Sequence, residues 1–449
     1  MRRYVLRALE NLRYSLFWSL DRLKGGNVKK HYKDIRFILE QFESSSSKQK
    51  RNDALKMLLE HAVKTTVFYK NYKHAKTVQD FPVINKTSIR EHKKNMLSQA
   101  FSAKKIITVK TSGSTGATLE IVQNSNKKQR NTADTLYFSE LAGFKLGYKL
   151  YYVRLWVAYL KKQRISIWKQ NIHPVNVIEL NDAYLKNLIE HIKTDPSRKG
   201  WLGYASGFEA ICKYLDKTKS PPIHTHVKSI IAISESLNEY TKQSMSRYFG
   251  VPTVSRYSNW ENGIMAQQTP DGTTDFKINW ASYLVEILEF DTNNPVKDGD
   301  LGRIVITDLF NYALPMIRYD TGDVGAMDTS VSPPVLKKVE GRQSDIVFNT
   351  QGEMVSPLIM SCLLNYSGVI QGQLIQETQN KYTLKLNATS EFNREFDLLN
   401  ELKDYLGNKA IIHSVYVNEI PLLASGKRKM MVNNYNNKRW KNPLISNSN

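Results

Sequence analysis

The stretch IITVKTSGSTGATLEIV, residues 106–122, decides how the rest of the chain is interpreted. The β-branched run Ile106–Val109 predicts one strand and Leu119–Val122 predicts a second. The residues between them are small and rich in hydroxyl groups: Thr111, Ser112, Gly113, Ser114, Thr115 and Gly116. Such a loop can direct backbone N–H groups and hydroxyls at one anion, and its glycines allow a phosphate to approach the backbone. The alternative is an ordinary surface hairpin, because the Gly-Lys-Ser/Thr ending of a P-loop is absent.

Length and composition indicate a globular protein of two or three domains. The chain has 449 residues, of which 41% are hydrophobic. Its two cysteines, Cys212 and Cys362, lack metal-binding spacing, which indicates a reducing compartment. No segment has the roughly 18 apolar residues of a membrane span. Arg7, Glu10 and Arg13 interrupt any signal-peptide core. We therefore expect a cytoplasmic protein.

The positive charge is concentrated at the N-terminal side. The whole chain carries +22, and residues 1–110 hold 25 Lys and Arg against 9 Asp and Glu, a net +16. Such an excess suits nucleic acid, an anionic membrane surface or an acidic ligand, or serves only for solubility. We expect no nucleic-acid partner.

Residues 1–23 predict an amphipathic helix. Its apolar residues recur at spacings of three and four: Tyr4, Val5, Leu9, Leu12, Leu16, Leu20 and Leu23. Arginines surround this stripe and Gly25–Gly26 ends it. The helix either packs on its own protein or lies peripherally on the inner face of an anionic membrane. Further along, Thr87 is a candidate helix cap, with Glu91 nearby.

Beyond the hydroxyl-rich loop, the pattern predicts an α/β fold with a β-rich subdomain. Helices are expected at 128–142, 181–194, 207–216 and 238–248, with β-rich pieces at 151–155, 175–180 and 229–233. From Trp280 onward, short strands with Gly and Asp turns predominate, and a smaller unit follows Gly341. The expected division is a helical basic extension (1–50), a large domain (51–340) and a small C-terminal domain (341–449).

Five separated motifs occur in a fixed order. They are TSGSTG at 111–116, YSNWE at 257–261, RYDTGD at 318–323, GRQSD at 341–345 and SGK at 425–427. Any one alone has a simpler interpretation, such as a local ion pair between Arg318 and Asp320 or a C-terminal turn at Ser425. Together, the five resemble the signature set of the adenylate-forming superfamily of acyl-CoA synthetases, adenylation domains and luciferases.

Within this superfamily the chain resembles the phenylacetate–CoA ligase group, and in particular its capsular-polysaccharide-type branch. FPVINKTSIRE at 81–91, Tyr204–Ser206 and AISESL at 232–237 carry that resemblance. It implies a large adenylation domain of layered sheets and helices, followed by a small, mobile α+β domain. The implied reaction joins a carboxylate to ATP with loss of pyrophosphate, and a nucleophile then displaces AMP.

The resemblance also implies roles for individual residues. The loop Thr111–Gly116 would bind the pyrophosphate, Ser234, Glu235 and Ser236 would follow the adenine, and Tyr257 would stack on it. Glu261 matches a magnesium ligand, and oxygen is the ligand that Mg²⁺ prefers. Asp323 matches the ribose acceptor, Arg342 a ribose or phosphate contact, and Lys427 the lysine that bridges the α-phosphate and the carboxylate.

Some features depart from the superfamily pattern or leave alternatives open. Ser344 and Asp345 leave the hinge position undecided, and Trp260 replaces a common Thr or Ser. Relatives carry Cys and His suggestive of a metal site, but Cys212 is the only cysteine of the middle region here, so no structural zinc is expected. Trp156, Tyr204, Phe208 and Trp260 are candidates for an aromatic wall of the acid pocket, and Glu235 or Glu209 for an ammonium partner.

The expected enzyme is an adenylate-forming ligase that uses ATP and Mg²⁺. Its acceptor is a glycan precursor of cell-surface polysaccharide or, alternatively, coenzyme A. A rival hypothesis is a non-catalytic protein that binds RNA or a membrane through its basic N-terminal region. Retention of Glu261, Asp323 and Lys427 disfavours the rival.

Overall fold

The computed structural model describes residues 2–101, 106–110, 119–156, 164–342, 347–352, 354–355, 359–360, 362–363, 366–421 and 429–435. Its helices are α1 (Arg2–Leu23), α2 (Asn27–Glu40), α3 (Ser45–Thr65), α4 (Lys86–Met96), α5 (Ser125–Leu141), α6 (Arg164–Lys169), α7 (Asp182–Thr194), α8 (Ala205–Lys217), α9 (Glu239–Phe249) and α10 (Glu395–Leu406). Short 3-10 turns occur at Lys70–Tyr72, Val78–Asp80, Gln99–Phe101 and Val177–Glu179.

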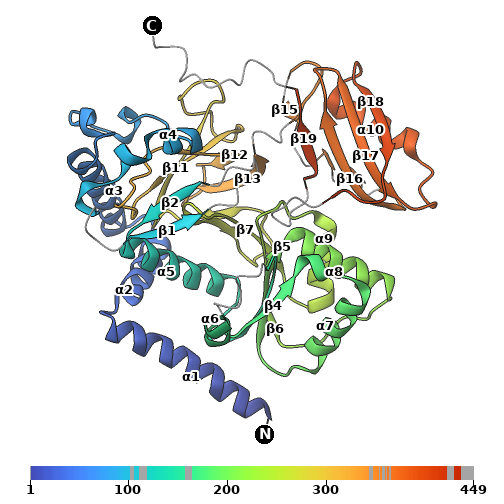
Figure 1. Cartoon of the computed structure of the whole chain (residues 1–449), viewed down its shortest axis with the longest axis horizontal. Coiled ribbons are helices and arrows are strands. Elements are labelled where there is room, and N and C mark those ends of the chain that lie inside the picture. The colour runs from blue at the N-terminus through green and yellow to red at the C-terminus, as the bar shows by residue number, and fades with distance from the viewer. Residues whose placement is uncertain are drawn as a thin grey trace.

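An eleven-stranded sheet organises most of the chain (Figure 1). In spatial order its strands are β10 (Tyr283–Leu288), β11 (Gly302–Asp308), β12 (Tyr319–Asp328), β13 (Val335–Arg342), β9 (Phe276–Ile278), β8 (Gly263–Gln268), β7 (Thr253–Asn259), β6 (Val227–Ile233), β5 (Lys199–Tyr204), β3 (Lys149–Arg154) and β4 (Ile172–Asn176). Strands β4, β3, β5, β6 and β7 are mutually parallel, and the other pairs are antiparallel. The predicted combination of an α/β part with a β-rich part is therefore confirmed.

Crossover helices cover the parallel half of the sheet. Helices α7, α8 and α9 pack there on a core that includes the fully buried Trp201 and Phe208. Strand β6 reads VKSIIAI and is almost entirely buried, as expected for a parallel strand covered on both faces. The β-rich piece predicted at 175–180 is displaced, because β4 ends at Asn176 and a 3-10 turn follows.

Strands β1 (Ile107–Lys110) and β2 (Glu120–Gln123) form a separate antiparallel pair. The two predicted strands on either side of the hydroxyl-rich loop are thus present, and Ile107 lies opposite Gln123. The buried Ile121 and Val122 attach this pair to a core shared with α3, α4 and the start of β12.

The C-terminal segment has a sheet and a core of its own. Strands β18 (Ile411–Tyr416), β17 (Lys381–Ala388), β16 (Val369–Gln376) and β19 (Met431–Asn433) form a four-stranded sheet, and β14 (Val347–Phe348) pairs with β15 (Met354–Val355). Helix α10 buries Leu398, Leu402 and Leu406 against the four-stranded sheet. Figure 1 shows these elements together at one side of the molecule. That this segment moves as a domain stays a prediction.

The N-terminal helices continue into the body of the protein. The expected boundary at residue 50 lies inside α3. Helix α2 packs on α5, where Arg130 forms an ion pair with Asp34 at 2.8 Å. The neighbouring Lys127 and Asp308, both fully buried, pair at 2.6 Å and connect α5 to β11. Buried charges need such partners, so these pairs specify how the helices sit on the sheet.

Candidate functional site

The candidate site begins at the carboxyl ends of the parallel strands. Cross-strand register places Tyr204, the last residue of β5, beside Ile233 at the end of β6, and Ile233 beside Arg256 in β7. The predicted residues Ser234–Ser236 and Tyr257 follow directly at this edge. Ligands of α/β sheets bind at the carboxyl ends of the strands, so the fold brings these predicted residues to the expected edge.

Tyr257 and Asp323 are in direct contact. The Tyr257 hydroxyl donates a hydrogen bond of 2.8 Å to Asp323 Oδ2 and lies 3.2 Å from Thr321 Oγ1. Three strands separate β7 from β12 in the sheet, so the sheet must curl to bring these side chains together. Burial and the nearby carboxylate raise the pKa of Tyr257 well above its ordinary value. Tyr257 therefore stays a neutral hydrogen-bond donor.

Arg342 is the cross-strand partner of Asp323. The two residues stand opposite each other in the antiparallel pair β12–β13, next to an irregularity in register. The predicted ribose acceptor and the predicted ribose or phosphate contact are thus backbone neighbours. The Arg342 side chain lies outside the described part.

The predicted metal ligand Glu261 is buried against a lysine. Its carboxylate, 3% exposed, forms an ion pair of 3.0 Å with Lys86 Nζ. The Tyr319 hydroxyl donates to Glu261 Oε1 at 3.4 Å, and Gln123 Nε2 donates to the Glu261 carbonyl at 3.2 Å. Strand β2, helix α4 and strand β12 therefore all contribute to the position of this carboxylate.

Lys86 is a site residue that sequence reasoning did not identify. It is the first residue of α4, and Asn85 caps that helix by accepting a 3.0 Å hydrogen bond from the Ser88 N–H. The prediction that Thr87 is the cap is wrong, because Asn85 already supplies the acceptor with Ser88 as its reciprocal partner. The motif FPVINKTSIRE contains Lys86, but the sequence carries no signal that pairs it with Glu261.

The segment after β6 has an unusual backbone. Ser234 adopts φ of 71°, in the left-handed region that is uncommon for a residue other than glycine. The next residue, Glu235, accepts a 2.7 Å hydrogen bond from the Ser206 N–H at the start of α8. Its carboxylate thus interacts with a helix N-terminus, which favours negative charge. Glu209, the other candidate partner for an ammonium group, pairs with Lys213 at 2.5 Å.

Three of the candidate pocket residues, Tyr204, Phe208 and Trp260, have different environments. Phe208 is fully buried and packs edge-on against Trp201, with ring centroids 6.1 Å apart. Trp260 is 54% exposed, and the Arg154 guanidinium lies 5.7 Å from its ring. Burial raises the pKa of Tyr204, and Arg154 opposes that shift. Arg154, at the end of β3, therefore stands near both Tyr204 and Trp260.

Arg154 is a second candidate that the sequence did not single out. Besides Trp260, its guanidinium lies 5.3 Å from the Trp156 ring and 5.4 Å from the Tyr152 ring. Arginine combines stacking on aromatic faces with donors suited to a carboxylate. It is a cation at the strand edge where the acid substrate is expected.

The local pair between Arg318 and Asp320 is not formed. Arg318 pairs with Glu286 at 3.1 Å, and Asp320 pairs with Arg303 at 2.8 Å. Arg318 also donates to the Phe81 carbonyl at 3.2 Å and has φ of 52°. Arg318, at the start of the RYDTGD motif, is therefore held in the packed interior between β11 and the segment before α4.

Several predicted site residues lie outside the described part of the chain. These are Thr111, Ser112, Gly113, Ser114, Thr115, Gly116, the hinge candidates Ser344 and Asp345, and Lys427. Their roles stay predictions. Among the described residues, no group of three or more His, Cys, Asp or Glu could hold a metal ion. Mg²⁺ usually takes one or two carboxylates plus phosphate oxygens, so Glu261 alone fits such a site if Lys86 moves aside.

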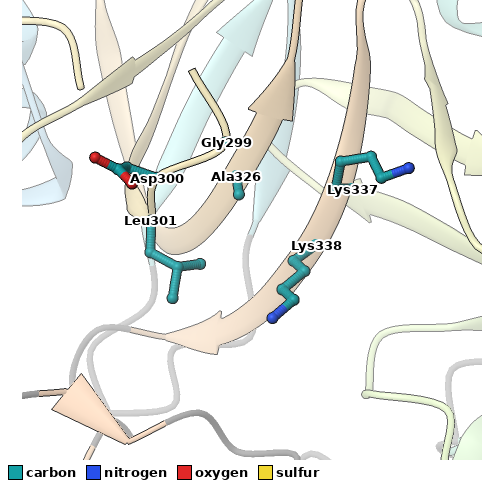
Figure 2. Close-up of a pocket in the computed structure, with 6 residues that line it drawn as sticks. All are labelled: Gly299, Asp300, Leu301, Ala326, Lys337 and Lys338. Carbon is teal, nitrogen blue, oxygen red and sulfur yellow. The ribbon is translucent and has the colours of Figure 1, made fainter. Parts of the chain in front are cut away.

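A surface hollow of about 450 Å³ lies beside β12 and β13 (Figure 2). Lys337, Lys338, Asp300 and Leu301 are among its lining residues, and Figure 2 shows Asp300 pointing away from both lysines. Lys337 is already paired with Asp275 at 2.9 Å. Of the predicted site residues that the structure describes, none lines this hollow.

Comparison with known proteins gives matches along most of the chain. Residues 347–434 match the family model of the CapK C-terminal domain. Protein CapK of Staphylococcus aureus is 22% identical over 377 residues, which cover 80% of each chain. Phenylacetate-coenzyme A ligase of Pseudomonas putida is 27% identical over 121 residues, covering 25% of this chain and 27% of that enzyme.

Solved structures share the fold. 2-Hydroxyisobutyryl-CoA ligase, in its postadenylation state with an acyl-AMP, superposes with a TM-score of 0.68 at 15% identity. The match covers 87% of this chain and 90% of that one. An ATP-bound RpMatB-BxBclM chimera gives a TM-score of 0.54 at 17% identity, covering 72% of this chain and 66% of the chimera.

These matches confirm the resemblance predicted from the five motifs. The chain is related to the CapK branch of the adenylate-forming superfamily and has the fold of its acyl-CoA ligases. The division of roles among its residues stays a prediction. Within the part of the chain that the structure describes, no helix is both long and apolar enough to cross a membrane.

Proposed function

We propose that the protein is an ATP-dependent ligase that activates a carboxylic acid as an acyl-adenylate. The observation that carries this proposal is the Tyr257–Asp323 hydrogen bond of 2.8 Å, together with the ion pair between the buried Glu261 and Lys86. A half-buried aspartate in β12 suits ribose hydroxyls, since a carboxylate accepts two hydrogen bonds. Relatedness to CapK and the fold shared with acyl-CoA ligases support the same reaction.

In the proposed first step, a carboxylate oxygen attacks the α-phosphorus of ATP, and pyrophosphate leaves. The loop Thr111–Gly116 would hold the leaving group through N–H groups and hydroxyls. Lys427 would offset negative charge between the α-phosphate and the attacking carboxylate. Glu261 would hold Mg²⁺, which neutralises phosphate charge when bound.

Arg154 is the cation that we propose for the acid side of the site. Its guanidinium stands near Tyr204 and Trp260, and its aromatic neighbours leave an apolar surface beside it. It would attract the substrate carboxylate before the attack. This arrangement suits an acid with an apolar or aromatic body, and Glu235 is less suited to an ammonium group because it interacts with the α8 N-terminus.

In the second step, a nucleophile attacks the acyl carbon and AMP leaves. We propose a membrane-linked glycan precursor as acceptor, because CapK is a relative over 80% of the chain. The enzyme would then work in the cytoplasm, at the inner face of the membrane. Coenzyme A is the second candidate acceptor, favoured by the shorter phenylacetate-coenzyme A ligase match.

The decisive experiment measures pyrophosphate release from ATP and Mg²⁺ against a panel of aromatic, aliphatic, hydroxy and amino acids. We expect release that depends on one class of acid. Lys427→Ala should reduce it by about 10²–10³-fold, the usual loss for a transition-state charge contact. Lys429→Ala, two residues away, is the matched control and should retain activity.

Three outcomes would count against this proposal or a part of it. Unchanged release in Lys427→Ala would contradict adenylation at the predicted site. Coenzyme A consumption that follows AMP formation one to one would favour the coenzyme A ligase over the glycan-directed enzyme. Absence of ATP binding by calorimetry would contradict the whole proposal.

A further inference from the structure

Helix α1 is amphipathic, but it exposes its apolar face and buries polar residues, the opposite of an ordinary surface helix. A surface helix normally buries its apolar stripe and exposes its charges. In α1 the buried residues are acidic, with Glu10 at 3% and Asp21 at 9% exposure. The apolar stripe faces solvent, and its members are between 40% and 83% exposed: Val5, Leu9, Leu12, Leu16, Leu20 and Leu23.

The acidic side of α1 fixes the helix to the body of the protein. Glu10 pairs with Arg198 at 2.6 Å and accepts a further 3.0 Å hydrogen bond from the Arg198 N–H. At the other end, Asp21 accepts hydrogen bonds from the backbone N–H groups of Val28 and Lys29, at 3.1 and 3.0 Å. Two anchors about eleven residues apart prevent the helix from rolling its leucines inward.

Aromatic contact adds to these anchors. Trp18 packs edge-on against Tyr32 of α2, with ring centroids 5.9 Å apart. The backbone of Gly147 lies so close to the Glu10 carbonyl that a Cβ there would come within 2.3 Å of it. Figure 1 shows α1 along one edge of the molecule, with its N-terminus directed away from α2. The leucine stripe is therefore presented outward on a fixed helix.

The charges around the stripe indicate what covers it. The basic residues of α1 and its C-terminal end include Arg7, Arg22 and Lys24, which are exposed, and Arg13, which is partly exposed. The two acidic residues of the helix are engaged with the body. An apolar stripe accompanied only by cations matches an anionic phospholipid surface, into whose boundary leucines insert while arginines remain at the phosphates.

A second copy of the chain fits this face less well. Two copies meeting through α1 would bring the same arginines together, with no exposed acid on either helix to pair with them. A helix of 22 residues offers a face about 33 Å long and about 10 Å wide. That is roughly 300 Å² per partner, well under the ~800 Å² of a stable interface.

We propose that α1 is a membrane-docking helix, which lies in the plane of an anionic bilayer with its leucine stripe in the acyl boundary. Docking would place the catalytic domain at the surface that carries the membrane-linked acceptor. In that respect the inference rests on the proposed function, although membrane binding itself requires no catalysis.

The test is flotation of the full-length protein with two kinds of vesicle. One is phosphatidylcholine alone, and the other is an equal mixture of phosphatidylcholine and phosphatidylglycerol. Leu12→Glu/Leu16→Glu places two charges in the stripe. Asn11→Glu/Ser15→Glu makes the same change in charge at exposed neighbouring positions outside it. We expect wild type and the control pair to float with the anionic vesicles, and the stripe variant to bind at least about tenfold more weakly.

High salt should weaken binding, and phosphatidylcholine alone should bind much less protein. The proposal is overturned if the stripe variant floats as well as wild type, or if wild type ignores anionic vesicles. It is also overturned if wild type is a dimer that the stripe variant converts to a monomer. Acid-dependent pyrophosphate release without vesicles reports separately on the proposed function, and the stripe variant should retain it.

Discussion

Glu261 and Asp323, the two carboxylates of the candidate site, are held by different kinds of partner. Glu261 is deeply buried and faces the ammonium group of Lys86 at 3.0 Å. Asp323 is half-buried and accepts a hydrogen bond from the neutral Tyr257 hydroxyl at 2.8 Å. The first environment has a cation in place, and the second has a hydroxyl in place. Each partner therefore resembles the ligand group that the carboxylate is proposed to bind.

This difference has a physical consequence for each side chain. A buried carboxylate without a nearby cation is costly, so Glu261 needs either Lys86 or a metal ion beside it. Asp323 keeps contact with solvent, and a second hydroxyl donor can reach its remaining lone pairs. We infer that a metal cation replaces Lys86 at Glu261, whereas ribose hydroxyls bind Asp323 in addition to the Tyr257 hydroxyl.

The largest effect is expected from Glu261→Gln. The amide keeps the shape of the side chain but loses the charge that would hold Mg²⁺, so acid-dependent pyrophosphate release should fall at least about 100-fold. Release is measured as a function of Mg²⁺ concentration. Glu91→Gln, at an exposed position of α4, should leave it unchanged. A loss smaller than about threefold in Glu261→Gln would remove Glu261 from the metal site.

Asp323→Asn should lower the affinity for ATP. Hydrogen bonds to charged groups are worth about 1.5–3 kcal/mol, so ATP should bind roughly tenfold or more weakly by calorimetry. Wild type should also bind 3′-deoxy-ATP more weakly than ATP, whereas Asp323→Asn should bind these two nucleotides with similar affinity. Equal affinity of wild type for both nucleotides would contradict a ribose contact at Asp323.

Sequence reasoning predicted the elements of the fold better than their contacts. The buried run in β6 and the strands on either side of the 111–116 loop were recognisable from local pattern alone. Tyr257 and Asp323 were each identified through a motif, but their hydrogen bond depends on the curl of a sheet in which three strands separate them. No local pattern encodes that curl.

Lys86 and Arg154 are two residues whose place in the candidate site could not be predicted from the sequence. A lysine at the start of a helix is ordinarily a solvated charge, and the partner of Lys86 lies 175 positions away in the sequence. Arg154 becomes a candidate only because the fold places Tyr204 and Trp260, from other elements, near it. Tertiary contacts of this kind cannot be read from one sequence.

Lys86→Met should lower the stability of the folded protein. Breaking a buried ion pair costs several kcal/mol, but the Lys86 side chain is 34% exposed, so we expect a loss of about 1–2 kcal/mol in the free energy of unfolding. Urea denaturation measures it, and Mg²⁺ should restore part of the loss in this variant. Lys94→Met, at an exposed position of the same helix, is the control. No loss, or a loss that Mg²⁺ leaves unchanged, would contradict cation exchange at Glu261.

The smallest effect is expected from Tyr257→Phe, because only one neutral donor to Asp323 is removed. ATP affinity should fall about threefold to tenfold, as for an ordinary hydrogen bond of ~1 kcal/mol. Burial raises the pKa of Tyr257, so its hydroxyl keeps its proton as pH rises, and its contribution should be the same at pH 7 and at pH 9.5. Calorimetry at both pH values tests this. If wild type and Tyr257→Phe bound ATP equally well at pH 9.5 but not at pH 7, the Tyr257 phenol would ionise in this range. Asp323 would then face a partner whose charge changes with pH, whereas Glu261 faces a permanently charged lysine.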